Sequence, residues 1–429
     1  MRALAPALTT ATLGLAGFGS LCFEAPALAQ DRQGWTLAQV MERAVEQSPD
    51  VQRAQAQVQI ADAHHVYGEQ PWVGNPVLAA RAMIGVPDDR AAIYALLVGL
   101  PFDFSGRQSL RSDEADALVE ASSAALDATR NEARTAAALA FVDVVAADGV
   151  REQRERRVRL AEDLVARTRT LFAAGTATQV DLSLIEAELG EARASLHGAE
   201  AEAAQRRAAL RALLDLEADD PLVIDGLEAP ASPAGQLAAW RERGLERRAE
   251  PRAYAARRRQ LRISEDRLFA ETVDPLTLGL EWESQGNSQM AHTMGFSLST
   301  TLPIARTAQG ERAVARSEGD LALVEQGIAE RTVQRDVVGT AARLEAHLRE
   351  LEAIGTTALP AMEQAREAIV AQLERGAADL FRVIGTQRQL VALRERRVEV
   401  LRDAWRARLE LERAMGMAGD LVVTSGGDR

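Results

Sequence analysis

Side chains that could perform chemistry are sparse in this sequence, and their spacing forms no reaction centre. The chain has five histidines, and no two of them stand four residues apart, the spacing that turns two imidazoles toward one metal on a helix. His64 and His65 are neighbours, so their side chains diverge by about 100° on a helix. The sequence also lacks a GxSxG turn, a phosphate-binding loop and a glycine-rich dinucleotide motif. We therefore expect no enzyme: no catalytic residue, no cofactor and no bound metal.

Clustered arginines are the next candidates for a binding site. Residues 154–157 (RERR) and 394–397 (RERR) mix bases with an acid, which is typical of solvated or interhelical charge pairs. The whole chain carries a formal net charge of -13, from 50 Lys and Arg against 63 Asp and Glu. An acidic chain is a poor nucleic-acid binder, because phosphate contacts require clustered positive charge.

The first thirty residues predict an export signal rather than a folded element. Arg2 is followed by an apolar run over 3–21, and Ala27-Leu28-Ala29 forms a small-x-small cleavage site. The alternative, a membrane-anchor helix, fits poorly with the Gly, Thr and Pro content of the segment. Cys22, the single cysteine, follows Leu21 rather than the small residue of a lipoprotein signal. We expect a signal peptide over 1–29, no lipid, and a mature chain without cysteine.

Residues 172–196 (FAAGTATQVDLSLIEAELGEARASL) organise the rest of the chain. Gly175 supplies the conformational freedom that ends an incoming helix. Asp181 stands in the first turn of the outgoing helix, where the dipole favours negative charge. From there, residues spaced alternately by three and four form a mostly apolar seam of the coiled-coil type: Leu182, Ile185, Leu189, Ala192, Leu196, Ala199, Ala203, Arg206, Leu210 and Leu213.

The same passage recurs about 200 residues later. Residues 373–383 (LERGAADLFRV) place Gly376 in the role of Gly175, and the seam continues in phase at Val383, Thr386, Leu390, Leu393, Arg397, Val400, Ala404, Ala407, Leu411 and Ala414. The chain is therefore predicted to contain two copies of one unit. We expect a first repeat over 30–218, a linker over 219–236, a second repeat over 237–416 and a flexible tail over 417–429.

Each repeat also contains two segments with a period of two, which predicts strands. They cover 76–84 and 91–100 in the first repeat, and 276–284 and 292–302 in the second. Their length suits transmembrane strands of roughly 9–11 residues. In a barrel, alternation would turn Leu278, Leu280, Phe296 and Leu298 to lipid, and Thr277, Glu281, Glu283, Ser297 and Ser299 to the lumen. A soluble hairpin on a helical protein is the alternative.

Long helices are predicted after each pair of strands. Residues 107–172 contain no proline, and residues 309–373 contain only Pro360. Aromatic residues make up 4% of the chain, which suits long helices packed through small side chains better than a large globular core. Pro49 and Pro251 are expected to break or kink the helix that opens each repeat.

The sequence resembles the outer-membrane efflux protein family, the TolC-like channels of Gram-negative bacteria, over essentially the whole mature chain. The resemblance rests on the double repeat, the A-G-T-x-x-x-V-D-L tip at 174–182, and Leu-Pro at 100–101 and 302–303. The closing Ala414-Met415-Gly416 supports it further. Ser48-Pro49 departs from the Asn-Pro that the family usually has. Residues 102–117 (FDFSGRQSLRSDEADA) most resemble the branch that serves heavy-metal or small-cation pumps.

The resemblance implies a mainly α protein with membrane β: a TolC-like two-repeat protomer in the outer membrane. Three protomers would form a 12-stranded β-barrel continuous with a long periplasmic α-helical barrel. Physical chemistry agrees, because an open sheet edge in lipid leaves backbone groups unsatisfied at several kcal/mol each. Four strands alone cannot close a pore.

As function, the resemblance implies the passive exit duct of a tripartite efflux system, with a periplasmic adaptor and a proton-driven inner-membrane pump as partners. Heavy-metal or cation efflux is the favoured substrate class. The alternatives are the outer-membrane duct of a type I protein secretion system, which has the same architecture, and a periplasmic coiled-coil adaptor or scaffold without a barrel.

The two tips are the functional positions that the resemblance implies. Adaptor docking falls on Ala174, Gly175 and Thr176, and on Arg375, Gly376 and Ala377. Family members commonly narrow the periplasmic end with carboxylates six and nine residues after the second tip glycine, where this chain has Arg382 and Gly385. Asp181 holds the matching place in the first tip, and Asp379 lies near Arg382. We hypothesise a periplasmic gate in which Asp181 and Arg382 pair; the alternative is that Asp181 only favours its helix start and Arg382 points to water.

Overall fold

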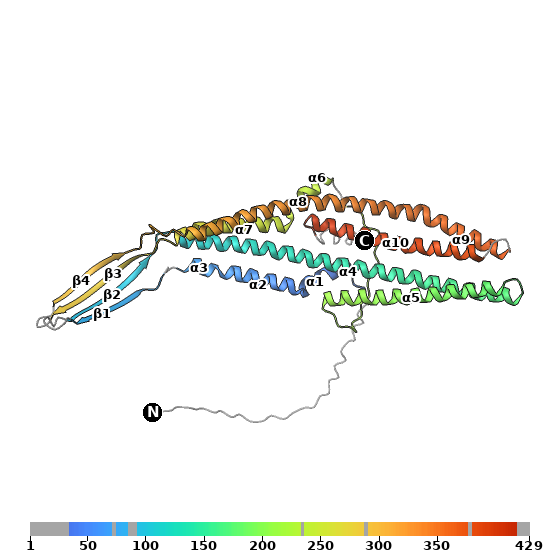
Figure 1. The fold of residues 1–429 in the computed structure, drawn as a ribbon, viewed down its shortest axis with the longest axis horizontal. Helices are drawn as coiled ribbons and strands as arrows, with labels where there is room; N and C mark the ends of the chain where they lie inside the picture. Colours follow the sequence, from blue (N-terminus) through green and yellow to red (C-terminus); the bar gives the residue numbers. More distant parts are fainter. Residues whose placement is uncertain are drawn as a thin grey trace, which may run out of the picture.

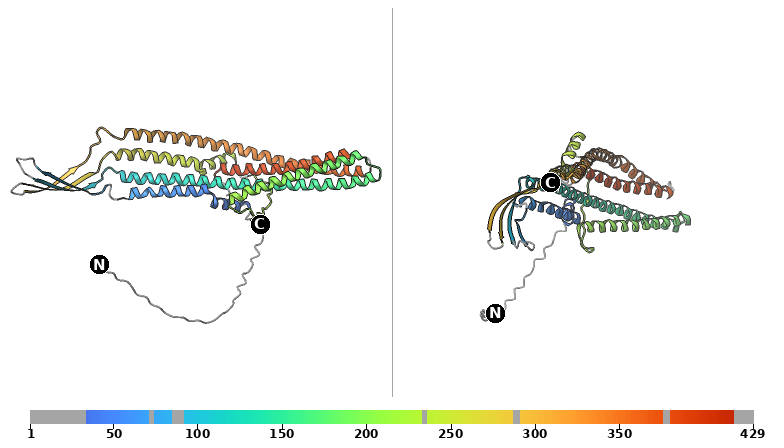
Figure 2. Two further views of the ribbon diagram at one scale, coloured as in Figure 1. Left: turned by 60° about the horizontal axis from the view of Figure 1, so that its bottom comes forward. Right: turned by 60° about the vertical axis from the view of Figure 1, so that its left-hand side comes forward.

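The computed structural model describes residues 34–70, 74–84, 92–232, 236–286, 291–375 and 380–417. The molecule is elongated, with a small sheet at one end and helices running to the other (Figures 1 and 2). The described helices include none that is long and apolar enough to cross a membrane. The expected signal peptide and Cys22 lie outside the described residues.

The same order of elements occurs twice along the chain. The first half contains α1 (Leu37–Gln47), α2 (Pro49–Ala63), α3 (His65–Glu69), β1 (Val77–Ile84), β2 (Ala92–Phe102), α4 (Arg107–Ala173) and α5 (Gln179–Leu214). The second half contains α6 (Leu237–Arg247), α7 (Ala249–Ala270), β3 (Leu276–Gly286), β4 (Ala291–Ser299), α8 (Gln309–Ala353), the π-helical turn η1 (Ile354–Ala358), α9 (Leu359–Glu374) and α10 (Leu380–Ala414).

Proline positions decide where the helices break. Ser48 ends α1 and caps α2, its hydroxyl accepting a hydrogen bond from the Val51 N–H, while Pro49 takes the first helical position, where its missing N–H costs nothing. At Pro360 the expected interruption takes the form of a π turn between α8 and α9. A wider turn relieves the clash of a proline ring with the preceding carbonyls, so the helical rod continues.

The longest element, α4, has 67 residues and extends about 100 Å at 1.5 Å per residue. It packs along α5, α7 and α10, and α7 packs in turn on α8. The predicted seams supply many of the buried contacts, including Ile185, Ala192, Val383, Leu390 and Leu411. At the end of the first seam the packing shifts by one residue: Leu214 is fully buried and the predicted Leu213 is 40% exposed.

The four strands form one antiparallel sheet in the order β1-β2-β3-β4. The central pair, β2 and β3, joins the two halves of the chain. The expected end of the last strand at residue 302 was wrong: β4 ends at Ser299, which lies opposite Thr277. Beyond this point β4 has no partner strand, because Pro275 precedes β3 and lacks an N–H for the ladder. Thr300 donates instead from its hydroxyl to the Asp274 carbonyl.

Other strand and tail boundaries also differ by a few residues. Strand β2 continues through Pro101 to Phe102, because β3 still lies opposite at Leu276. Strand β3 runs past the expected turn to Gly286, and β1 begins at Val77. Residue 91 and most of the expected tail lie outside the described residues. Met417, assigned to that tail, packs on the Trp240 cluster, after a Gly416 with φ of +67° ends α10.

Candidate channel-forming surfaces

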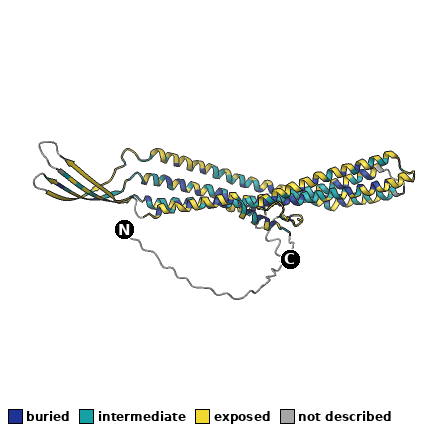
Figure 3. Cartoon of the chain, turned by 90° about the horizontal axis from the view of Figure 1, so that it is seen from below, coloured by how far each residue is buried: buried dark blue, intermediate teal, exposed yellow. Residues whose placement is uncertain are grey.

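One face of the sheet is apolar across all four strands. The register places Leu78, Val98, Leu280 and Phe296 in one cross-strand row. Two further rows lie on the same face, one on each side of this row. The first contains Ala80, Leu96, Trp282 and Met294, and the second contains Leu100, Leu278 and Leu298. These large side chains are exposed, from 37% for Trp282 to 84% for Phe296, and Figure 3 shows how little covers the strands. A continuous exposed apolar surface of this kind marks a contact with lipid or protein.

The opposite face carries the polar side chains predicted for the lumen. Thr277 lies opposite Ser299, and Glu281 and Glu283 share this face with Ser297. Arg81 falls in the same row as Glu283, with Ala95 between them. The structure therefore gathers the five predicted lumen residues on one face and the four predicted lipid residues on the other.

The first tip is a tight turn between α4 and α5. Gly175 has a φ of +77°, a left-handed conformation that favours glycine. Its neighbour Thr176 donates from its hydroxyl to the Leu171 carbonyl, 2.9 Å away. Ala174 ends α4. At the second tip, Arg375 is described at the end of α9, whereas Gly376, Ala377 and Asp379 lie outside the described residues.

Asp181 performs a local role within the protomer. Its carboxylate accepts from the Thr178 N–H at 2.8 Å and from the Thr178 hydroxyl at 2.6 Å, and the Thr178 hydroxyl in turn accepts from the Asp181 N–H. These hydrogen bonds lower the pKa of Asp181. Arg382 is exposed near the start of α10. Among the ion pairs of the described residues within one chain, none joins Asp181 to Arg382, so a pair between protomers stays a prediction.

Glu188 makes an interhelical contact that was not predicted from the sequence. Its side chain is 8% exposed and accepts hydrogen bonds from two arginines: Arg157 of α4 at 2.8 Å and Arg388 of α10 at 2.8 Å. Burial on its own raises the pKa of Glu188, but the hydrogen bonds from Arg388 and Arg157 outweigh that effect and lower it. Glu188 thus joins both helical hairpins at a level close to the tips. Its place between the seam residues Ile185 and Leu189 is the signal that could have revealed it.

Further ion pairs hold the two hairpins together along their length. Arg154 of α4 lies 3.3 Å from Glu395 of α10, and Arg406 of α10 lies 2.7 Å from Asp143 of α4. The RERR clusters thus contribute interhelical charge pairs, as their composition indicated. Removing a partner from such a partly buried pair leaves a charge without its counterion.

A largely apolar groove near the tips is lined by residues of α4, α9 and α10. Six leucine and valine side chains line it together with four charged ones: Leu160, Asp163, Leu164, Arg167, Leu171, Arg366, Glu367, Val370, Leu373 and Val383.

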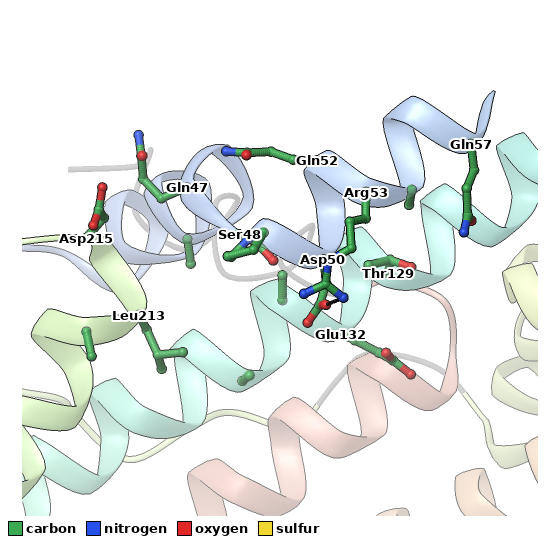
Figure 4. A pocket seen from close by; sticks show the side chains of 16 residues that line it. Gln47, Ser48, Asp50, Gln52, Arg53, Gln57, Thr129, Glu132, Leu213 and Asp215 are labelled. Atoms are coloured by element: carbon green, nitrogen blue, oxygen red, sulfur yellow. Dashed lines mark ion pairs between the residues drawn. The ribbon is translucent and has the colours of Figure 1, made fainter. Parts of the chain in front are cut away.

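A second groove lies at the junction of α1 and α2, where α4 and the end of α5 pass (Figure 4). Its polar side chains include Gln47, Gln52 and Glu132, and an ion pair of 2.8 Å between Arg53 and Asp50. Both partners of that pair are mostly exposed. Within the described ranges, no group of three or more His, Cys, Asp or Glu side chains could hold a metal ion.

Comparison with known proteins gives a sequence relative and several structural ones. The chain is 26% identical over 332 residues to the cobalt-zinc-cadmium resistance protein CzcC of Cupriavidus metallidurans, covering 74% of this chain and 76% of the relative. No family model matches the sequence.

Solved structures of outer-membrane channels share the fold. The outer-membrane channel OprN superposes with a TM-score of 0.73 at 18% identity, covering 89% of this chain and 90% of its own. CusC, whose structures are described for transmembrane channel formation, superposes with a TM-score of 0.73 at 16% identity. The superposition covers 91% of this chain and 95% of CusC. The outer membrane protein VceC of Vibrio cholerae superposes with a TM-score of 0.70 at 18% identity, covering 89% of this chain and 96% of VceC.

These comparisons confirm the predicted fold, a mainly helical protomer with a small sheet. OprN and VceC are themselves described as an outer-membrane channel and an outer membrane protein. The chain thus shares its fold with OprN, CusC and VceC, and its sequence is similar to that of CzcC over about three quarters of its length.

Proposed function

We propose that three copies of this chain form a passive exit duct of a tripartite efflux system. The observation that carries the proposal is the sheet: four strands with one continuous apolar face and two unpaired edges, β1 and β4. Unpaired edges are not tolerated in lipid, so β4 of one copy pairs with β1 of the next. Three copies close an even-numbered barrel of twelve strands.

The helices support the same arrangement. Helix contacts run in the order α2, α4, α7 and α8, so α2 and α8 form the lateral edges of the protomer. On α8, Val314, Leu321, Val324 and Ile328 are each more than half exposed at a heptad-like spacing. On the other edge, Ile60, Val66 and Tyr67 are also more than half exposed. Two different apolar edges suit a head-to-tail contact that closes into a ring.

We expect the detergent-purified mature protein to be a trimer that dissociates on heating and conducts ions in planar bilayers. Mass photometry or light scattering with detergent correction would measure the mass, and bilayer recording would measure conductance. A monodisperse monomer in buffer without detergent would contradict the duct, and so would a trimer that never conducts.

Heavy-metal cations are the substrate class that we propose. Support comes from the CzcC relative, whose name records cobalt, zinc and cadmium resistance, and from the acidic balance of the chain. A duct receives its substrate from its partners, so the decisive assay uses cells in which the proposed adaptor and pump are also present. Loss of zinc, cobalt or cadmium tolerance on deleting this gene would support the proposal. Loss of protein secretion instead would favour the type I secretion duct.

The adaptor is proposed to dock at the two tips, where Gly175 is exposed at the far end of the helices. The apolar groove between α4 and α9 opens beside the same tips. A helical hairpin of an adaptor could lay an apolar stripe along such a groove, which is a recurring mode of helix recognition.

The gate is proposed to combine two kinds of link. Within each protomer, Glu188 ties α5 and α4 to α10 through Arg157 and Arg388. Between protomers, Asp181 would meet Arg382 of the adjacent hairpin. Each exposed pair would contribute only about 0.2–1 kcal/mol, but three copies around a ring could favour the closed state.

Single-channel conductance at low salt tests the gate. Asp181→Arg and Arg382→Asp should each raise conductance, and the double exchange should restore the low value; salt should blunt the difference by screening. Glu188→Gln should also raise conductance, because it releases Arg388. If only Glu188→Gln changes conductance, the Asp181–Arg382 pair has no part in the gate.

A further inference from the structure

Helix α5 has an uncovered side in the protomer, whereas α10, its counterpart in the second repeat, is covered on two sides. Helix α10 packs on α8 and α9 and also on α4. Helix α5 packs on α4, and its other main contact is α1, at the end that contains Leu210 and Leu214. Figure 1 accordingly shows α10 between α4 and α9, and α5 at the edge of the helices. A further helix can therefore pack on α5 in the way that α4 packs on α10.

The contact between α10 and the first hairpin, formed by α4 and α5, is tied by ion pairs. Arg388, Glu395 and Arg406 of α10 lie 2.8, 3.3 and 2.7 Å from their partners in that hairpin. Two of these partners, Glu188 and Asp143, are only 8% and 13% exposed. Separating the two hairpins of one protomer would therefore leave partly buried charges without their counterions.

The repeat shows which residues take the same places on the uncovered side of α5. The two tip glycines are 201 residues apart (376 − 175), and this offset carries α5 onto α10. The counterparts of the three α10 residues are then Ala187, Ala194 and Gln205, and all three are exposed. Glu188 corresponds in turn to Gln389. Each of these four counterparts is uncharged.

Small side chains complete this side of α5. Gly190, Gly198 and Ala201 are also exposed, and they continue the series at spacings of three and four residues, which places them on one side of the helix. An added Cβ at Gly190 or Gly198 would meet no heavy atom within 4 Å. Helix axes approach to about 8 Å where the side chains at the contact are small. The uncovered side of α5 thus fits a closely packed helix.

The repeat also identifies the helix that covers this side. In a ring of protomers, α5 of one copy follows α9 of the copy before it, just as α10 follows α4 within one copy. Since α9 corresponds to α4 and α5 corresponds to α10, the contact of α9 with the next copy's α5 matches the contact of α4 with α10. The two kinds of contact alternate around the ring, and the ion pairs described above belong to the contact within a protomer.

We infer that the two hairpins of each protomer move as one unit, and that the tube opens along the three contacts between protomers, where α9 meets the Ala187 side of the next copy's α5. This contact parts without separating an ion pair of the kind that Glu188 makes. Of the proposed gate links, the one between Asp181 and Arg382 releases while Glu188 stays paired. The inference rests on the proposed trimeric duct and adds the contact at which its periplasmic end opens.

Reversible crosslinks test which contact parts. In one variant, Ala187→Cys/Gln389→Cys, a flexible bis-methanethiosulfonate linker joins neighbouring protomers. In the matched variant, Arg154→Cys/Glu395→Cys, the same linker joins the two hairpins of one protomer. The chain has no other cysteine once residues 1–29 are removed. On a denaturing gel, the first variant should migrate as linked trimers and the second as a monomer.

The largest single-channel conductance level in planar bilayers is recorded before and after the linker is reduced. Linking 187 to 389 should abolish that level and reduction should restore it, whereas linking 154 to 395 should leave it unchanged. Loss of the level in both linked variants, or in neither, would overturn the inference and leave the duct intact. Absence of linked chains from the first variant, in a trimer that conducts, would show that another element covers α5. Absence of conductance in the native trimer would overturn the proposed duct and the opening contact with it.

Discussion

Leu280→Arg is expected to abolish insertion of the protein into lipid. Leu280 lies at the middle of β3, between Val98 and Phe296 on the apolar face. An arginine at the midplane of a lipid-facing strand costs about 2–4 kcal/mol, and a trimer carries three of them. Each 1.4 kcal/mol is a factor of about ten in an equilibrium constant, so the inserted fraction should fall by well over tenfold. Flotation of vesicles after refolding from detergent measures that fraction.

Glu281→Arg is the matched control for this change. It introduces the same side chain one residue further along β3, on the opposite face. If that face lines the lumen, the arginine stays in water and insertion should match that of the native protein, while ion selectivity in bilayers shifts toward anions. Equal insertion of both variants would show that the apolar face does not meet lipid.

Gly175→Trp is expected to abolish export while leaving the trimer and its conductance intact. An added Cβ at Gly175 would meet no heavy atom within 4 Å, so a side chain there projects into open space at the tip. The φ of +77° adds strain of about 1–2 kcal/mol for an L-residue, which the long helices can tolerate. The indole would occupy the place where the adaptor is proposed to approach. Metal tolerance of cells and crosslinking to the adaptor measure the loss.

Gly175→Ala separates bulk from strain. Alanine carries the same penalty for a positive φ but adds only a methyl group, so export should remain close to the native level. Export lost equally in both variants would assign the effect to the strained turn. Undiminished export by Gly175→Trp would remove the tip from the docking surface.

Period-two and period-seven patterns allowed much of this fold to be predicted from the sequence. Alternation along a strand fixes which residues share a face, so Leu278 and Leu280 could be separated from Thr277 and Glu281 without coordinates. The seam from Ile185 onward likewise predicted burial, because residues three and four apart lie on one side of a helix. Local chemistry also predicted the Gly175 turn, where only a flexible backbone closes the tip.

Pairing between distant segments was decided by the tertiary structure alone. Strand length depends on the partner: β2 continues through Pro101 because β3 lies opposite, whereas β4 stops before Pro303 because its partner has ended. Nothing local distinguishes the two prolines. The order of strands, with β2 beside β3, likewise joins segments about 180 residues apart, which a periodic pattern cannot specify.

Glu188 illustrates the same limit at the candidate gate. By sequence it is one of many carboxylates on a helix, and Asp181 is the residue that motif position singles out. In the fold, Arg388 donates to Glu188, which lies 200 residues away in the sequence. The Asp181 carboxylate instead accepts hydrogen bonds from Thr178 at the start of its own helix. The sequence by itself determined the repeat, the strand faces and the tips, because each follows from local periodicity or backbone freedom. The partner of each charge depended on how the hairpins pack, because ion pairs form between whichever side chains the packing brings within a few ångströms.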